Sequence, residues 1–122
     1  EMAMGMGIHG EPGIWNGPLK TAEELARESC DTILNDMPLE KGSQVALLIN
    51  GLGSTPLDEQ YILADSVIRY LGTKGVKVYR SWVGEYATSM EMAGASVTLC
   101  KVDEELKGWF DEPVHTPFYT QV

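Results

Sequence analysis

The chain has 122 residues, 43% of them hydrophobic, which suits one globular domain with its own core and leaves little room for a second. Its 9 basic and 18 acidic residues give a formal net charge of −9, so we expect it to repel nucleic acid and anionic membrane surfaces. The longest apolar run, residues 45–49, is far shorter than the roughly 20 residues that a membrane-spanning helix needs.

Long and small side chains alternate at the start of the chain. Met2, Met4, Met6 and Ile8 are separated by an alanine and two glycines, and this period of two predicts a strand with one bare face. An intact protein rarely begins in the middle of a strand. We therefore expect the chain to be a fragment of a longer protein.

A glycine- and proline-rich loop follows, with the sequence GIHGEPG at residues 7–13. Glycine adopts positive φ without steric cost, so such a loop can bend sharply and admit another molecule. Its imidazole, His9, is our candidate for the chemistry, although a lone histidine in a loop is most often an ordinary solvated residue. Glu11 is a candidate general base or partner of His9, with a solvated carboxylate as the simpler interpretation.

Residues 5–10 also match the letters of the dinucleotide-binding motif G-x-G-x-x-G. That motif binds a pyrophosphate only where its third glycine opens a helix, whose amides meet the phosphates. Here Gly10 is followed by Glu-Pro-Gly, and the next helix is predicted only from Thr21. A nucleotide site in this loop is therefore not favoured.

The first helix is predicted over residues 21–37, where apolar side chains recur at three- and four-residue spacing. Thr21 and Glu24 form a capping-box pair at its start, and Pro38 ends it. The run at 45–49 is apolar at every position, which predicts a strand in the interior of a sheet.

A second glycine-rich loop, residues 50–56, leads into a helix predicted over 57–74. Thr55 is expected at the N-cap with Pro56 as the first helical residue, and Gly75 is expected to stop the helix. Free amides in the loop could bind an anion or a partner. An ordinary tight connection between strand and helix explains the loop as well.

Two further strands are predicted at 76–83 and 96–102, joined by an irregular polar stretch that suits an interface or a solvated loop equally. Asp103 is expected to cap a short helix, after which a proline-containing tail runs over 113–122. The order of elements predicts an α/β domain of two layers, with a mixed sheet of at least four strands and helices packed on one face. The other face would be covered by a partner subunit or a missing domain.

The remaining reactive side chains point to no metal. Cys30 and Cys100 are interpreted as two buried thiols of a cytoplasmic protein, with a disulfide as the alternative. No cluster of histidine, cysteine and aspartate has metal-ligand spacing, and His115 lies in the tail, where it has no evident partner.

Four stretches together resemble the DhaK-type dihydroxyacetone kinases, in the same order and over nearly the whole chain; they are residues 4–13, 48–57, 83–94 and 99–106. The resemblance is to the second half of the DhaK domain only. It implies that residues 1–122 are the C-terminal subdomain, and that the first subdomain, which in the family supplies most of the substrate pocket and the acidic base, is absent from this chain. Ile14, Trp15 and Asn16 stand where many relatives carry arginine.

The resemblance also implies a role for the loop. In the family, the histidine at the position of His9 bonds covalently to the carbonyl carbon of dihydroxyacetone as a hemiaminal, and Gly7, Gly10 and Glu11 belong to the same substrate loop. The ketone is then phosphorylated to dihydroxyacetone phosphate. The phosphoryl donor, ATP with magnesium or a phosphotransferase-system protein, would be held by another domain or subunit, so no cofactor or metal is expected on this chain.

The implied partners are dihydroxyacetone or a related short ketose, the first DhaK subdomain, a nucleotide-binding DhaL-type domain or subunit, and a second copy in a homodimer. We expect these 122 residues alone to be inactive as a kinase. A second function stays open, because some DhaK-like proteins act as ketone-sensing regulatory coactivators without kinase activity. The motifs of the second half do not separate the two.

Overall fold

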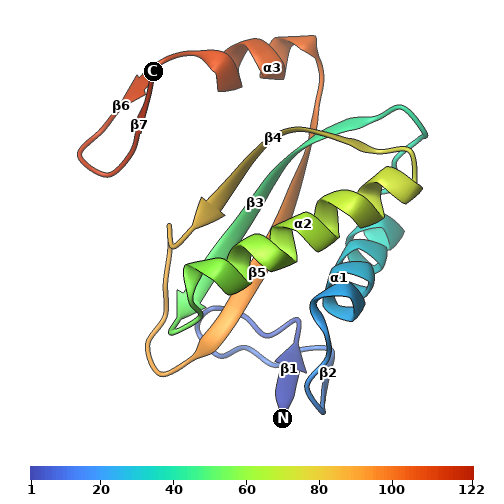
Figure 1. The fold of residues 1–122 in the computed structure, drawn as a ribbon, viewed down its shortest axis with the longest axis vertical. Coiled ribbons are helices and arrows are strands. Elements are labelled where there is room, and N and C mark those ends of the chain that lie inside the picture. The colour runs from blue at the N-terminus through green and yellow to red at the C-terminus, as the bar shows by residue number, and fades with distance from the viewer.

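The computed structural model describes residues 1–122 and contains three helices and seven strands (Figure 1). In chain order they are β1 (Met2–Met4), β2 (Trp15–Gly17), α1 (Ala22–Asp36), β3 (Gln44–Gly53), α2 (Leu57–Thr73), β4 (Lys77–Gly84), β5 (Ala93–Val102), α3 (Glu104–Asp111), β6 (Val114–His115) and β7 (Thr120–Gln121). None of the helices combines the length and the apolar character needed to cross a membrane.

The central sheet has three strands in the order β4-β3-β5, with β3 parallel to β4 and antiparallel to β5. The predicted α/β fold with a mixed sheet is therefore confirmed. The other strands form two separate hairpins, β1–β2 and β6–β7, so the strand predicted at the N-terminus lies outside the main sheet.

The N-terminal strand is shorter than the alternating pattern predicted. It ends at Met4 because Gly5 adopts φ +78°, a conformation that turns the chain away from the extended line. The backbone N–H of Ile14 then donates to the carbonyl of Met4 at 2.6 Å, and β2 returns antiparallel to β1. Met6 and Ile8 consequently lie in the connecting loop rather than in a strand.

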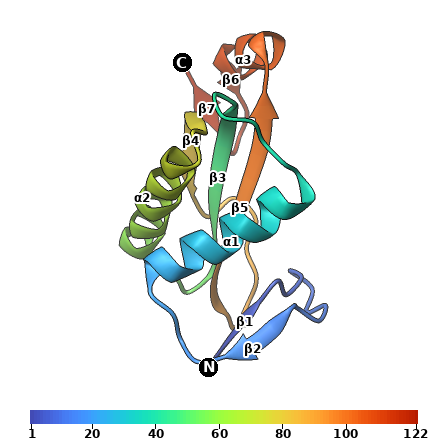
Figure 2. The ribbon, with the colours of Figure 1, turned by 90° about the vertical axis from the view of Figure 1, so that its right-hand side faces the viewer.

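The core lies between the sheet and the first two helices, as Figure 2 shows for α1 and α2 on one side of β3. Alternate residues of β3 point into it, and they are joined there by small and branched side chains of the helices. The buried cluster comprises Ala26, Cys30, Val45, Leu47, Ile49, Ala64, Val67, Leu71 and Val76. Packing of α1 and α2 on one face agrees with the prediction.

Most of the predicted helix ends are confirmed. Thr21 and Glu24 form the capping box, with hydrogen bonds of 2.8 and 3.2 Å between each side chain and the other's backbone N–H. Gly75 adopts φ +75° directly after α2. The N-cap of α2 is Pro56 rather than Thr55, because Pro56 is itself extended and its carbonyl accepts the N–H of Gln60.

The C-terminal tail is more ordered than the sequence indicated. It forms the hairpin β6–β7, whose turn is held by the Tyr119 N–H donating to Thr116 Oγ1 at 2.8 Å. The indole N–H of Trp82 in β4 donates to the Tyr119 hydroxyl at 2.7 Å, and the Trp82 ring lies 5.4 Å from that of Phe110 in α3. These aromatic contacts join segments that are distant in the sequence.

The two cysteines differ in environment, and the prediction that both are buried is wrong for Cys100. Cys30 is buried in the core, whereas Cys100 is exposed on β5, opposite Ala46 and away from the helices. No disulfide joins them. Burial, with a smaller contribution from the adjacent Asp31 carboxylate, raises the pKa of the Cys30 thiol to about 11.

We expect the two thiols to react with an alkylating reagent at different rates. The thiolate is the reactive form, so an alkylating reagent at about pH 8 should modify Cys100 rapidly and Cys30 only when the chain unfolds. Mass spectrometry with and without denaturant measures both rates, and a Cys100→Ser variant is the control that should show no fast phase. Equal rates for the two thiols in the folded chain would contradict the placement of Cys30.

Replacing Leu47 by alanine should lower the free energy of unfolding by about 2–5 kcal/mol, because a fully buried leucine leaves a cavity that the neighbouring side chains fill only in part. Leu19→Ala is the matched control: its side chain is exposed, and the change should stay within about 0.5 kcal/mol. Both values come from denaturant titrations followed by circular dichroism. Similar losses for the two variants would show that Leu47 is not in the core.

Candidate functional site

The loop that carries His9 connects β1 to β2, at the end of the molecule opposite α3 and the hairpin β6–β7 (Figures 1 and 2). Two backbone hydrogen bonds fold it: Gly10 N–H donates to the Gly7 carbonyl at 2.9 Å, and Gly7 N–H donates to the Glu11 carbonyl at 3.0 Å. Gly10 has φ +86°, which a residue with a side chain rarely adopts. The loop therefore has a defined turn with the imidazole at its tip.

His9 and Glu11 lie against each other in this turn. The His9 side chain is 86% exposed, and its Nδ1 atom lies 3.6 Å from Oε1 of Glu11. The other carboxylate oxygen, Oε2, accepts the backbone N–H of His9 at 3.1 Å. Glu11's own backbone N–H is the main group that holds the pKa of this carboxyl below its usual value; desolvation opposes the shift, and the backbone N–H of His9 adds to it.

The Glu11 carboxylate occupies the space beside Gly7 that a side chain at residue 7 would take. A Cβ atom at residue 7 would lie 1.9 Å from Oε2 of Glu11, far inside van der Waals contact. The structure thus brings all four predicted loop residues together: Gly7, His9, Gly10 and Glu11. Their roles toward a ligand stay predictions.

A cluster at the base of the hairpin holds it to helix α1. The indole N–H of Trp15 donates to Oε1 of Glu28, and the Lys20 ammonium lies 2.7 Å from Oε2 of the same carboxylate. The ammonium also lies 4.4 Å from the centre of the Trp15 ring. This cluster was not among the residues predicted from the sequence. The available signal was a tryptophan directly after the loop, since a buried indole N–H needs an acceptor.

A second polar centre joins β3 to the loop between β4 and β5. Asn50 is only 6% exposed; its Oδ1 accepts the N–H groups of Tyr86 at 2.8 Å and Ala87 at 3.1 Å, and its Nδ2 donates to the Ala87 carbonyl at 2.7 Å. The sequence analysis included Asn50 in a loop and gave it no role. Its position as the polar residue that ends an apolar run was the signal.

The second glycine-rich loop is occupied by contacts within the protein. Gly53 N–H donates to Thr88 Oγ1 at 2.9 Å, and Ser54 N–H donates to the Met92 carbonyl at 2.8 Å. These two amides are therefore not available to an anion, so the geometry favours the ordinary connection over an anion site. Thr88 in turn donates to the Glu85 carboxylate at 2.5 Å, within the predicted polar cluster.

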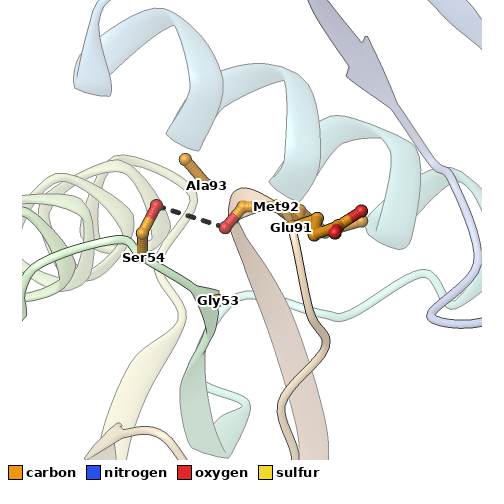
Figure 3. Close-up of a pocket in the computed structure, with 5 residues that line it drawn as sticks. All are labelled: Gly53, Ser54, Glu91, Met92 and Ala93. Carbon is orange, nitrogen blue, oxygen red and sulfur yellow. Dashed lines mark hydrogen bonds between the residues drawn. The ribbon is translucent and has the colours of Figure 1, made fainter.

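A hollow of about 510 Å³ lies between these two loops. Its lining residues, shown in Figure 3, are Gly53, Ser54, Glu91, Met92 and Ala93. The Ser54 hydroxyl donates to the Met92 carbonyl at 3.3 Å, while the Glu91 carboxylate points away from it. A serine without an adjacent base is not an activated nucleophile. The hollow therefore offers no catalytic group of its own.

A larger cleft of about 640 Å³ separates the β1–β2 hairpin from the helices and the start of β5. Its lining is mainly apolar, and it includes the buried Gln60, whose Oε1 has no hydrogen-bond partner. His9 lines neither this cleft nor the smaller hollow. No three histidine, cysteine, aspartate or glutamate side chains lie close enough together to hold a metal ion.

The arrangement can present a single imidazole, braced by one carboxylate, to a molecule that approaches from outside. An exposed imidazole of this kind can add to an electrophilic carbon or accept a hydrogen bond. Apart from Glu11, no acid or base contacts His9 within the chain. The loop by itself lacks the groups for a complete proton or phosphoryl transfer.

Curated proteins similar to this chain are subunits or domains of ketose kinases. This chain is 44% identical over 119 residues to the dihydroxyacetone-binding subunit DhaK of the PTS-dependent dihydroxyacetone kinase 2 of Listeria innocua. The match covers 98% of this chain and 36% of that protein. The DhaK subunit of the PEP-dependent kinase of Escherichia coli is 36% identical, with 96% and 40% covered. A D-erythrulose kinase of Mycolicibacterium smegmatis is 39% identical, with 97% and 20% covered.

Among solved structures, the dihydroxyacetone kinase operon co-activator DhaQ is similar, with a TM-score of 0.82 and 35% identity over 89% of this chain and 34% of that one. The chain thus spans well under half the length of each of these relatives. Residues 1–118 match the family described as the Dak1 domain. On this match and these identities, the chain belongs to the Dak1 domain family and corresponds to a fragment of the DhaK domain.

Proposed function

We propose that this chain is the ketone-holding part of a dihydroxyacetone kinase, and that His9 binds the ketone covalently as a hemiaminal. The observation that carries the proposal is the exposed imidazole on a turn built by Gly7, Gly10 and Glu11, in a chain that matches the Dak1 domain over residues 1–118. Two of the similar proteins, from Listeria innocua and Escherichia coli, are named as dihydroxyacetone-binding subunits of kinases.

A covalent bond suits a small substrate that offers few groups for a protein to contact. A neutral imidazole nitrogen adds reversibly to the carbonyl carbon of a ketone, and glycerol, which has no carbonyl group, is rejected. The ketone's terminal hydroxyl stays free to accept a phosphoryl group, so His9 holds the substrate and does not carry the phosphoryl group itself. Holding a substrate in the reactive geometry can supply several kcal/mol of rate enhancement.

The remaining parts of the reaction must come from outside these residues. His9 has no acid or base partner besides Glu11, and the chain spans 36% and 40% of the two DhaK relatives. We assign the acidic base to a first DhaK subdomain and the phosphoryl donor, ATP with magnesium or a phosphotransferase-system protein, to a DhaL-type partner. The assembled protein would be a cytoplasmic homodimer that acts on dihydroxyacetone or a related short ketose.

A regulatory function is the second candidate. The solved structure of a dihydroxyacetone kinase operon co-activator matches this fold with a TM-score of 0.82 and 35% identity. A ketone sensor needs the same covalent hold on its ligand and no phosphoryl transfer. The two candidates therefore differ in turnover and agree on the role of His9.

Replacing His9 should abolish the covalent adduct. With dihydroxyacetone labelled at the carbonyl carbon with ¹³C, the protein should convert part of the ketone signal to that of a tetrahedral carbon bonded to nitrogen. His9→Asn, which cannot add to a ketone, should lose this signal. His115→Asn is the matched control and should keep it, because His115 lies in the β6–β7 hairpin at the other end of the fold. An adduct that survives in the His9 variant would overturn the proposal.

The 122 residues alone should not phosphorylate dihydroxyacetone, whether ATP with magnesium or a phosphorylated transfer protein is supplied with a DhaL-type subunit. The expected cause is the missing base, since general base catalysis typically contributes about 10²–10⁴-fold to a rate. A coupled assay for dihydroxyacetone phosphate measures turnover, with an intact dihydroxyacetone kinase as the positive control. Turnover by this chain above the buffer background would show that the base lies within it.

A further inference from the structure

The two oxygens of Glu11 face two different nitrogens of the same histidine. Oε2 accepts the backbone N–H of His9 at 3.1 Å, and Oε1 lies 3.6 Å from the ring nitrogen Nδ1. The carboxylate therefore bridges the main chain and the ring of His9. The second ring nitrogen, Nε2, is separated from Nδ1 by one ring carbon, on a side chain that is 86% exposed.

The distance of 3.6 Å between Oε1 of Glu11 and Nδ1 of His9 is slightly longer than a hydrogen bond. A shift of a few tenths of an ångström would bring the two atoms within hydrogen-bond distance. Contacts of this kind are often long in the unliganded protein and tighten when the substrate binds. An ionised carboxylate can only accept hydrogen bonds, so its complement at Nδ1 is an N–H group. Glu11 is held in its ionised form, because its pKa is lowered by its own backbone N–H and by that of His9.

The turn is shaped around this carboxylate. Gly7 leaves the space that Oε2 occupies, since a Cβ there would lie 1.9 Å from it, and the Gly7 N–H donates to the Glu11 carbonyl at 3.0 Å. Bracing of the turn alone would need only Oε2. Oε1, which this bracing does not use, lies 3.6 Å from Nδ1 and can accept a hydrogen bond from the ring.

We propose that Glu11 is a positioning residue that keeps the proton of the neutral His9 ring on Nδ1 and so makes Nε2 the atom that bonds the ketone. This inference rests on the proposed function and deepens it. The hydrogen bond at one ring nitrogen decides which tautomer a histidine adopts, so the other nitrogen is left with its lone pair. A buried aspartate orients the catalytic histidine of serine proteases by the same principle.

The step balances without an additional reactant. The Nε2 lone pair forms the bond to the carbonyl carbon, and the π electrons of the C=O bond move to the oxygen. The ring becomes a cation whose Nδ1–H faces the Glu11 carboxylate, which stabilises that charge. The oxygen takes up one proton from the solvent, and the ring stays an imidazolium whose Nδ1–H is paired with the Glu11 carboxylate.

The tautomer can be observed before any ketone is added. In two-bond ¹H–¹⁵N spectra of the ¹⁵N-labelled chain, at a pH where the ring is neutral, His9 should show a protonated Nδ1 and an unprotonated Nε2. Glu11→Ala, which leaves Nδ1 without an acceptor, should move the main population to the Nε2–H tautomer, whereas Glu11→Gln keeps an uncharged amide oxygen there and should shift the population only in part. The His115 ring is an internal control in the same spectra, because its Nδ1 lies 3.1 Å from Thr120 Oγ1, far from the loop, and its signals should not change.

The second readout is the ¹³C adduct signal. Loss of a hydrogen bond to a charged group predicts roughly tenfold weaker apparent binding of dihydroxyacetone by Glu11→Gln, which has nearly the same shape and should keep the fold. A His9 ring already in the Nε2–H form in the unmodified chain, or a tautomer that is unchanged in both variants, would overturn the inference.

The inference and the proposed function can fail separately. If Glu11 controls the tautomer and no adduct forms in the unmodified protein, the positioning role stands and the covalent mechanism falls. If the adduct forms with unchanged affinity in both Glu11 variants, the covalent mechanism stands and the role of Glu11 falls.

Discussion

Burial of β3 is the constraint on which the rest of the structure depends. The strand is paired along both edges, with β4 on one side and β5 on the other, and Val45, Leu47 and Ile49 are completely buried beneath α1 and α2. The backbone of β3 is hydrogen-bonded along both edges, and one face of the strand is covered by the helices. The strand therefore determines where both helices pack. Helix α1 then carries the β1–β2 hairpin through Glu28, whose carboxylate accepts Trp15 and pairs with Lys20. The loop that carries His9 therefore lies outside the main sheet, on a hairpin whose base is tied to α1 by the Glu28 carboxylate.

In this arrangement the backbone of the turn is defined by hydrogen bonds, while the imidazole that it carries is exposed. The turn around His9 is specified by local contacts, namely the Gly7–Glu11 backbone bond and the carboxylate that bridges the histidine, while the imidazole itself remains open to solvent. A group that must add to a small ketone and later release it benefits from such a position, since the ordering cost is met by the turn before the ligand arrives. The cleft under the hairpin and the unpartnered Gln60 oxygen in its wall belong to the same end of the molecule. In our proposal, this end of the molecule holds the ketone through His9. The acidic base and the phosphoryl donor must come from other domains or subunits.

Local sequence signals predicted local structure well. The capping box at Thr21 and the helix stops at Pro38 and Gly75 depend on neighbouring residues only, and the structure agrees with each of them. Features that depend on distant partners were not predictable in this way. The period of two from Met2 to Ile8 indicated a longer strand, since nothing in the pattern shows that Gly5 would turn the chain. The exposure of Cys100, the Tyr119 contact that orders the tail and the three hydrogen bonds of Asn50 each need a tertiary neighbour. The turn that Gly7, His9, Gly10 and Glu11 form could be expected because a glycine-rich loop around a histidine is a local pattern, while the role of these residues toward a ligand stays a prediction.

The central claim is that His9 forms a covalent bond to the ketone. The most direct measurement is a crystal structure of the protein soaked with dihydroxyacetone. The account predicts continuous electron density from Nε2 of His9 to the carbonyl carbon, which becomes tetrahedral, with the Glu11 carboxylate within hydrogen-bond distance of Nδ1. An unmodified His9 in a crystal that holds intact dihydroxyacetone elsewhere would contradict it.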